Sequence, residues 1–152
     1  MYTKIAVPVD LAHTDKLNKA LSTAADLAKH YRASVYLLAV TSSAPSEVAH
    51  NPDEFSEKLQ QFADAQTAAL GVEFETREAV TPDPAIDLVK VLDEQIHALG
   101  ADLVVMASHV PGFRDYVFAS HSGYLVSHTD LSVFVVRQIC IDCAKRKRRR
   151  FL

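Results

Sequence analysis

The chain has few of the residues that would cross-link it, anchor it in a membrane or build a glycine-rich loop. Its 152 residues include two cysteines, four glycines and no tryptophan. Cys140 and Cys143 both lie near the C-terminus, so they cannot staple the body of the domain, and this fits a reducing compartment. No apolar run approaches the ~20 residues that cross a bilayer. The sequence also begins directly with a strand pattern rather than a signal peptide. We therefore expect a cytoplasmic protein that makes no membrane contact.

Acidic residues are missing after Asp142, where basic residues are concentrated. Lys145–Arg150 supplies six of the sixteen basic residues, which leaves ten basic and nineteen acidic residues before it, a net charge of −9. An acidic body argues against a nucleic-acid-binding face, so we expect such contact only through the basic tail. Residues 138–152 follow the last predicted strand, and we expect them to be disordered. Cys140 and Cys143 form a C-x-x-C pair, which alone has too few ligands for a zinc site.

Hydrophobic periodicity predicts alternating strands and helices over residues 1–137. Strands are predicted at 4–10, 34–40, 72–80, 102–108 and 132–137, and helices at 14–31, 55–70, 84–99 and 120–128. Thr14 or Asp15 is placed to cap the first helix and Asp83 the third, while Gly71 and Gly100 end the second and third. Every connection is long enough for a helix, so the strands are predicted to be parallel. The sequence predicts one α/β domain with an open, doubly wound sheet and helices on both faces.

The stretch after the fourth strand has the position of a phosphate-binding loop, yet it is poor in glycine. "MASHVPGFRDYVFASHSG", residues 106–123, contains only Gly112 and Gly123. In doubly wound domains ligands bind beyond the carboxyl ends of the strands. These ends are Val9–Asp10, Val40–Thr41 and Met106–Ala107. The sequence therefore raises the question of whether this loop still holds a phosphate.

Catalytic and metal-binding motifs do not emerge from the sequence. Neither G-x-S-x-G nor G-x-x-x-x-G-K-[ST] occurs, and no serine can be paired with a base by spacing. His109, His121 and His128 are twelve and seven residues apart, which differs from the i, i+4 spacing of helical zinc sites. We predict no metal site and no dedicated enzymatic activity.

Three stretches of the chain resemble the universal stress protein family. They are "KIAVPVD", "SVYLLAV" and "LVVMASHVPGFRDYVFASHSGYLVSHTDLSVFVVR", and the resemblance spans residues 2–137. "ASHVP" is closer to a subgroup whose loop begins Ala-Ser-His-x-Pro than to the glycine-rich form. The glycines of nucleotide-binding members are matched here by Ala107, Val110 and Ala119. Of these, the β-branched Val110 most strongly resists a positive φ.

This resemblance implies a fold, a ligand and partners. The fold is Rossmann-like, with a five-stranded sheet in the order 3-2-1-4-5, and the ligand is ATP or another adenine nucleotide, with Mg²⁺ allowed beside it. The family generally dimerises through antiparallel pairing of its last strand, here Ser132 to Arg137, and an unidentified regulatory protein would be a further partner. The nucleotide-binding residues it implies are Pro8, Val9, Asp10, Val40, Met106, Ala107, Ser108, His109, Arg114, Ala119, Ser120 and His121.

Individual roles follow from the same resemblance. Asp10 would accept a hydrogen bond from the ribose, the Val40 backbone would meet the base, and Met106 would lie beneath the nucleotide. Ser120 and His121 would meet phosphate at the start of the last helix, where backbone amides favour anions. The residues alone leave other interpretations open, because Asp10 could cap the following turn and both Val40 and Met106 could belong to the core.

Three functional hypotheses remain at this point. The first is a stress-response or regulatory module that binds an adenine nucleotide at the carboxyl ends of the first and fourth strands. The second is a nucleotide-independent dimeric interaction protein whose phosphate loop has degenerated. The third is slow ATP hydrolysis through a metal-bound water.

Overall fold

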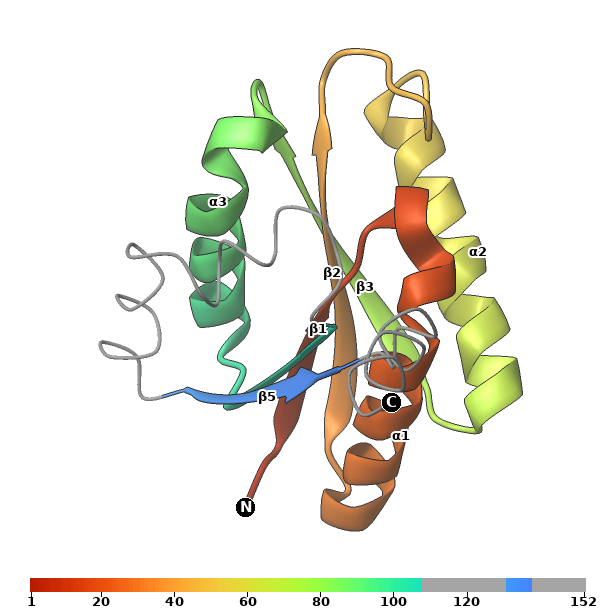
Figure 1. Cartoon of the computed structure of the whole chain (residues 1–152), viewed down its shortest axis with the longest axis vertical. Helices are drawn as coiled ribbons and strands as arrows, with labels where there is room; N and C mark the ends of the chain where they lie inside the picture. Colours follow the sequence, from red (N-terminus) through yellow and green to blue (C-terminus); the bar gives the residue numbers. More distant parts are fainter. Residues whose placement is uncertain (108–130, 138–152) are drawn as a thin grey trace, which may run out of the picture.

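Five parallel strands form one sheet at the centre of the structure. The computed structural model describes residues 1–107 and 131–137. The strands are β1 (Lys4–Pro8), β2 (Ser34–Ser42), β3 (Phe74–Thr81), β4 (Leu103–Ala107) and β5 (Ser132–Val136). Their order is β3-β2-β1-β4-β5 and every neighbouring pair is parallel, which confirms the predicted fold class and strand order (Figure 1). The order reverses between β1 and β4, so their carboxyl ends mark the expected ligand-binding region.

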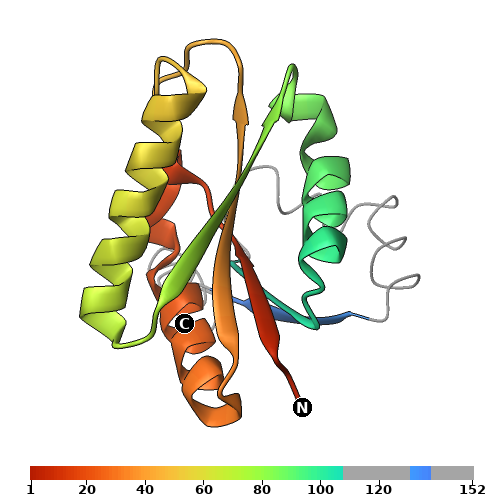
Figure 2. The same cartoon turned by 180° about the vertical axis from the view of Figure 1, so that it is seen from behind.

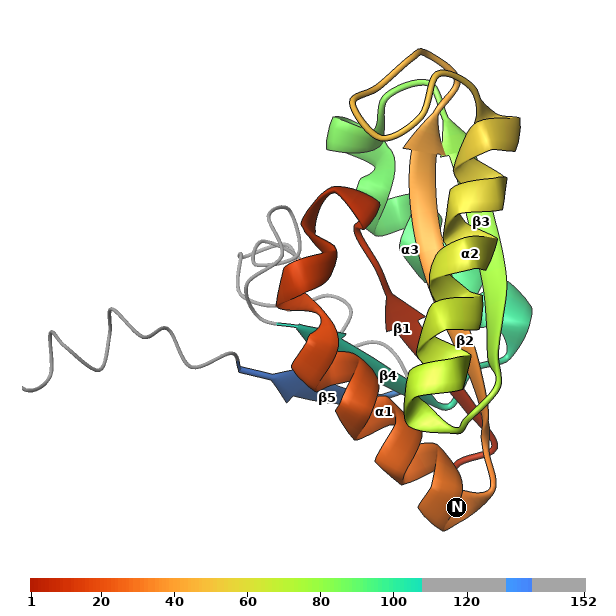
Figure 3. The same cartoon turned by 90° about the vertical axis from the view of Figure 1, so that its right-hand side faces the viewer.

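Helices cover both faces of this sheet. α1 (Asn18–Tyr31) and α2 (Pro52–Leu70) lie on one face and α3 (Pro84–Leu99) lies on the other, as the front and back views show (Figure 1 and Figure 2). A view turned by a quarter looks onto the face of the sheet that α1 and α2 cover (Figure 3). The central strands are therefore covered on both faces, which explains their almost continuous apolar sequences. Their fully buried residues include Ile5, Val7, Val35 and Leu37.

The predicted helix ends are mostly confirmed. Gly71 and Gly100 end α2 and α3 in the left-handed conformation, with φ of 69° and 68°, which residues with a side chain rarely adopt. The Asp83 carboxylate accepts a hydrogen bond from the Ala85 N–H at 3.1 Å and caps α3 as predicted. Asn51 caps α2 by accepting from the Glu54 N–H at 2.8 Å.

The predicted start of the first helix is wrong. The chain first forms a 3₁₀-helix, η1 (Leu11–Lys16), and α1 begins only at Asn18, after Leu17, which provides no side-chain cap. Thr14 and Asp15 lie inside η1 rather than at a helix start. The cause is Asp10, whose carboxylate accepts from the Ala12 N–H at 2.9 Å and turns the chain as soon as β1 has ended.

Asp102 joins the amino ends of β1 and β4. Its carboxylate accepts hydrogen bonds from the N–H groups of Thr3 and Lys4, at 2.8 and 3.0 Å, and from the Thr3 hydroxyl at 3.0 Å. Partial burial opposes ionisation, yet these donors together hold the pKa of Asp102 below its ordinary value. Asp102 was predicted to be the first residue of a strand, but β4 begins at Leu103.

The helices within residues 1–107 and 131–137 include none with the length and apolar character needed to cross a bilayer. The predicted helix at 120–128 and the basic tail at 138–152 lie outside the described residues.

Candidate functional site

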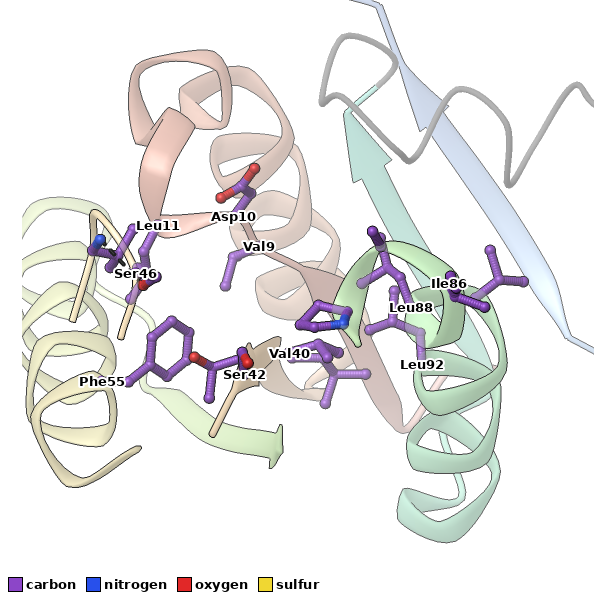
Figure 4. Close-up of a pocket in the computed structure, with 16 residues that line it drawn as sticks. Val9, Asp10, Leu11, Val40, Ser42, Ser46, Phe55, Ile86, Leu88 and Leu92 are labelled. Atoms are coloured by element: carbon purple, nitrogen blue, oxygen red, sulfur yellow. Dashed lines mark hydrogen bonds between the residues drawn. The ribbon is translucent and has the colours of Figure 1, made fainter. Parts of the chain in front are cut away.

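A pocket lies at the carboxyl ends of β1 and β2. Its volume is about 530 Å³, within the range of pockets that hold small organic ligands. Its lining comes from the ends of β1 and β2, the loop before α2 and the first turns of α2 and α3 (Figure 4). The lining residues are Val9, Asp10, Leu11, Leu38, Val40, Thr41, Ser42, Ser46, Val48, Phe55, Pro84, Ala85, Ile86, Leu88, Val89 and Leu92.

β2 continues past the end of β1, and this leaves one edge of β2 open toward the pocket. The last paired residues are Pro8 and Leu38, after which the Val9 N–H donates to the Leu38 carbonyl at 2.8 Å. The N–H and C=O groups of a strand point to alternate sides from residue to residue, so those of Val40 face the same side as those of Leu38. Within the described chain, no β1 residue pairs with Val40 because η1 has already begun. This Val40 edge offers a donor and an acceptor side by side.

The Asp10 carboxylate also lines the pocket, and it organises η1 (Figure 4). One oxygen accepts from the Ala12 N–H, and the other lies 2.9 Å from Nδ1 of His13. The Asp10 side chain is 31% exposed. Asp10 therefore caps the following turn, which was one of the two roles predicted for it. The carboxylate can still accept further hydrogen bonds, because an ionised carboxylate has about four acceptor sites.

Apolar side chains line the pocket on two sides of the Val40 edge. Leu11 and Phe55 lie on the α2 side, whereas Leu88 and Leu92 lie on the α3 side (Figure 4). A flat ring whose polar edge meets Val40 would thus have apolar surface on both faces.

These walls were not predicted from the sequence. Phe55 and Leu92 lie in the helices predicted at 55–70 and 84–99, and both are buried. Their position could have indicated the role of α3, because α3 starts directly after the carboxyl end of β3 and its first turns must lie at the ligand-binding edge. Ile86, in the first turn of α3, is 78% exposed beside the pocket.

The loop between β2 and α2 is held in place by Glu54. The Glu54 carboxylate accepts from the His50 N–H at 2.8 Å, and it lies 3.0 Å from the His50 ring and 2.7 Å from Nζ of Lys58. The hydrogen bond from Lys58, followed by those from His50, lowers the pKa of Glu54 to about 2. Lys58 also donates to the Val48 carbonyl. The loop therefore forms a supported wall of the pocket.

The predicted site residues fall into three groups. Val9, Asp10 and Val40 line the pocket. Pro8, Met106 and Ala107 are buried in β1 and β4 and do not belong to its lining. The rest lie outside the described residues, so their predicted roles stay predictions: Ser108, His109, Arg114, Ala119, Ser120 and His121.

The described part of the chain contains no group of three or more His, Cys, Asp or Glu side chains placed to hold a metal ion. The histidines considered in the sequence analysis, His109, His121 and His128, lie outside it.

Comparison with known proteins gives concordant results. The family model described as Universal stress protein family matches residues 1–137. Universal stress protein G of Shigella flexneri is 29% identical over 146 residues, covering 90% of this chain and 100% of that protein. A universal stress protein structure from Archaeoglobus fulgidus in complex with dAMP has a TM-score of 0.56 and 21% identity, covering 88% of this chain and 97% of that one. An Arabidopsis thaliana family structure with AMP bound has a TM-score of 0.54 and 16% identity, covering 92% and 94%.

Proposed function

The chain belongs to the universal stress protein family, and on that premise we propose that its pocket binds an adenine nucleotide. Binding would make the protein a regulatory module of the cytoplasmic stress response. Structures of relatives with AMP and dAMP support an adenine ligand.

The Val40 edge is the observation that carries the proposal. Adenine presents a ring nitrogen acceptor next to an exocyclic amino donor, and this pattern complements one backbone N–H and the C=O of the same residue. The apolar walls at Leu11 and Leu88 lie on either side of a ring in that position. Asp10 lines the same pocket at the end of β1, and in this proposal it would accept from a ribose hydroxyl.

The phosphate end of the ligand is the part that the described residues do not cover. The sequence supports a phosphate contact through Ser120 and the first amides of the predicted last helix. The missing glycines predict a weaker cradle than in glycine-rich members. We therefore expect affinity to depend mainly on base and ribose, so that AMP and ATP bind with similar strength.

Calorimetric titration of the full chain with AMP, ATP and IMP tests this proposal, with ATP titrated in the presence and absence of Mg²⁺. IMP carries an oxygen where adenine has the amino group and should bind at least tenfold more weakly, because two acceptors would then face each other at Val40. Asp10→Asn retains a capping oxygen but removes the charge, and it should weaken AMP about tenfold. Asp64→Asn, on the exposed face of α2, is the matched control. If IMP binds as tightly as AMP, the Val40 backbone does not recognise the amino group of adenine.

A nucleotide-independent dimer is the second candidate function. β5 occupies the edge of the sheet next to β4, and its Phe134 is 46% exposed. Antiparallel pairing with a second copy would cover this strand and its unpaired backbone groups. Light scattering should then show a dimer that Phe134→Glu converts to a monomer. A dimer that binds no adenine compound would favour this function over the first.

A further inference from the structure

We infer that the pocket accepts adenine nucleotides carrying an alkyl or arylalkyl group on the exocyclic N6 amine, and that it binds them more tightly than the unmodified nucleotide. This inference rests on the proposed function and extends it to the chemical class of the ligand.

The orientation of the base follows from the direction of β2. Along a strand the N–H of a residue precedes its C=O, so at Val40 the acceptor group lies on the side of Thr41 and Ser42. Adenine can offer either of two ring nitrogens to the Val40 N–H, and both flank the same amino group. In both arrangements N6 meets the Val40 carbonyl and is directed toward the Ser42 end of the pocket. One N6–H is used there, and the other position on N6 is available for a substituent.

The Ser42 end of the pocket lies on the opposite side of Val40 from α3, and Ser42, Ser46 and Phe55 are grouped there (Figure 4). Ser42 Oγ accepts from the Ala44 N–H at 3.1 Å. The apolar lining at this end is the side chain of Val48 together with the small part of Phe55, 5% of the residue, that remains exposed.

The serine at position 46 is engaged within its own loop. Its hydroxyl donates to the Ala49 carbonyl at 3.2 Å and accepts from the N–H groups of Val48 and Ala49, each at 3.3 Å. It therefore has little capacity left for a ligand amine. Ser46 is exposed, so an amino hydrogen directed at this end would meet water rather than a strong protein acceptor, whereas a carbon group would gain apolar contact with Val48.

This end of the pocket is also preformed. Glu54 holds the loop through His50, and Lys58 bonds the Val48 carbonyl. An apolar substituent would thus enter an existing surface and would not have to order a flexible loop, which reduces the entropic cost of binding. Each buried methylene adds roughly fourfold in affinity, so a partly buried benzyl group should add about tenfold.

Titration of the full chain with AMP, N6-benzyl-AMP and N6,N6-dimethyl-AMP tests the inference. We expect N6-benzyl-AMP to bind about tenfold more tightly than AMP. N6,N6-dimethyl-AMP has no hydrogen for the Val40 carbonyl and should bind at least tenfold more weakly. Equal or weaker binding of N6-benzyl-AMP, with AMP still bound, overturns this inference and leaves the proposed function intact. Absence of binding by all three compounds overturns both.

A pair of valine variants locates the substituent. Val48→Asn places an amide at the predicted contact and should reduce the ratio of N6-benzyl-AMP to AMP affinity about fivefold. Val80→Asn makes the same change on β3, at a side chain that is 48% exposed and does not line the pocket, and should leave the ratio unchanged. An unchanged ratio in Val48→Asn, with that variant folded as judged by its melting curve, would contradict the proposed position of the substituent.

Discussion

Replacing Asp102 by alanine should weaken the fold without touching the pocket. The substitution removes the acceptor of three hydrogen bonds, from the N–H groups of Thr3 and Lys4 and from the Thr3 hydroxyl. Hydrogen bonds to charged groups contribute about 1.5–3 kcal/mol each when buried. These are partly exposed, and water can replace some of them, so we expect a total loss of about 2 kcal/mol. In a chain of this length that loss lowers the melting temperature by roughly 4–8 °C.

The pH dependence of this loss is a sharper test than its size. Because the pKa of Asp102 is lowered in the folded state, its contribution is present above the ordinary aspartate pKa of ~3.9. The contribution disappears as the pH falls through that value and then through the lower folded-state pKa. The stability difference between the natural chain and Asp102→Ala should therefore be constant from about pH 7 to pH 5 and should shrink below about pH 4.

Urea unfolding followed by circular dichroism measures this difference at each pH. Subtracting the two chains cancels the titration of the other carboxylates. The reasoning would be refuted by a difference that stays constant down to about pH 2, or by a loss below about 0.5 kcal/mol at pH 7. AMP titration provides the internal control, since Asp102 lies at the amino end of the strands and the pocket at the carboxyl end.

Three further changes probe the ends of helices and the wall of the pocket. Asp10→Ala should destabilise the chain by about 1 kcal/mol because it removes the cap of η1, while Asp10→Asn should cost less, and paired thermal melts distinguish them. Gly100→Ala should cost about 1–2 kcal/mol, since φ is 68° and no atom would meet the added methyl group. Equal stability by urea unfolding would contradict that conformational argument. Glu54→Gln should speed amide hydrogen exchange in the loop before α2, because Lys58 and His50 lose their common charged acceptor. In the natural chain this protection should persist at pH 4, since the pKa of Glu54 is about 2.

Most helix ends follow from local patterns in the sequence, whereas the strand order was implied by the family resemblance. Asp83–Pro84 and the glycines at 71 and 100 act through their own backbone or through the next few residues, and the structure confirms all three. Thr14 was misjudged because the decisive cap, Asp10, lies before a 3₁₀ turn that interrupts the helical pattern. Such a turn has too few residues to show a periodicity of its own.

The pocket was only partly predictable because its walls depend on how far each element extends. Val9, Asp10 and Val40 lie at strand ends that can be read from the sequence, and all three line it. Leu11 and Leu88 line it because η1 and α3 both begin at that edge of the sheet. The open edge at Val40 could not be predicted, since it requires the register of Pro8 with Leu38 and the early turn at the end of β1.

Because β2 is longer than β1, a small molecule would occupy the position beside β2 that a further strand residue normally fills. Where the shorter strand stops, no residue of the described chain completes the next rung of the ladder, and a purine would take that place as if it were one more residue. A bound purine would stabilise the folded chain by mass action, so the stability of the fold would rise with the concentration of the free ligand.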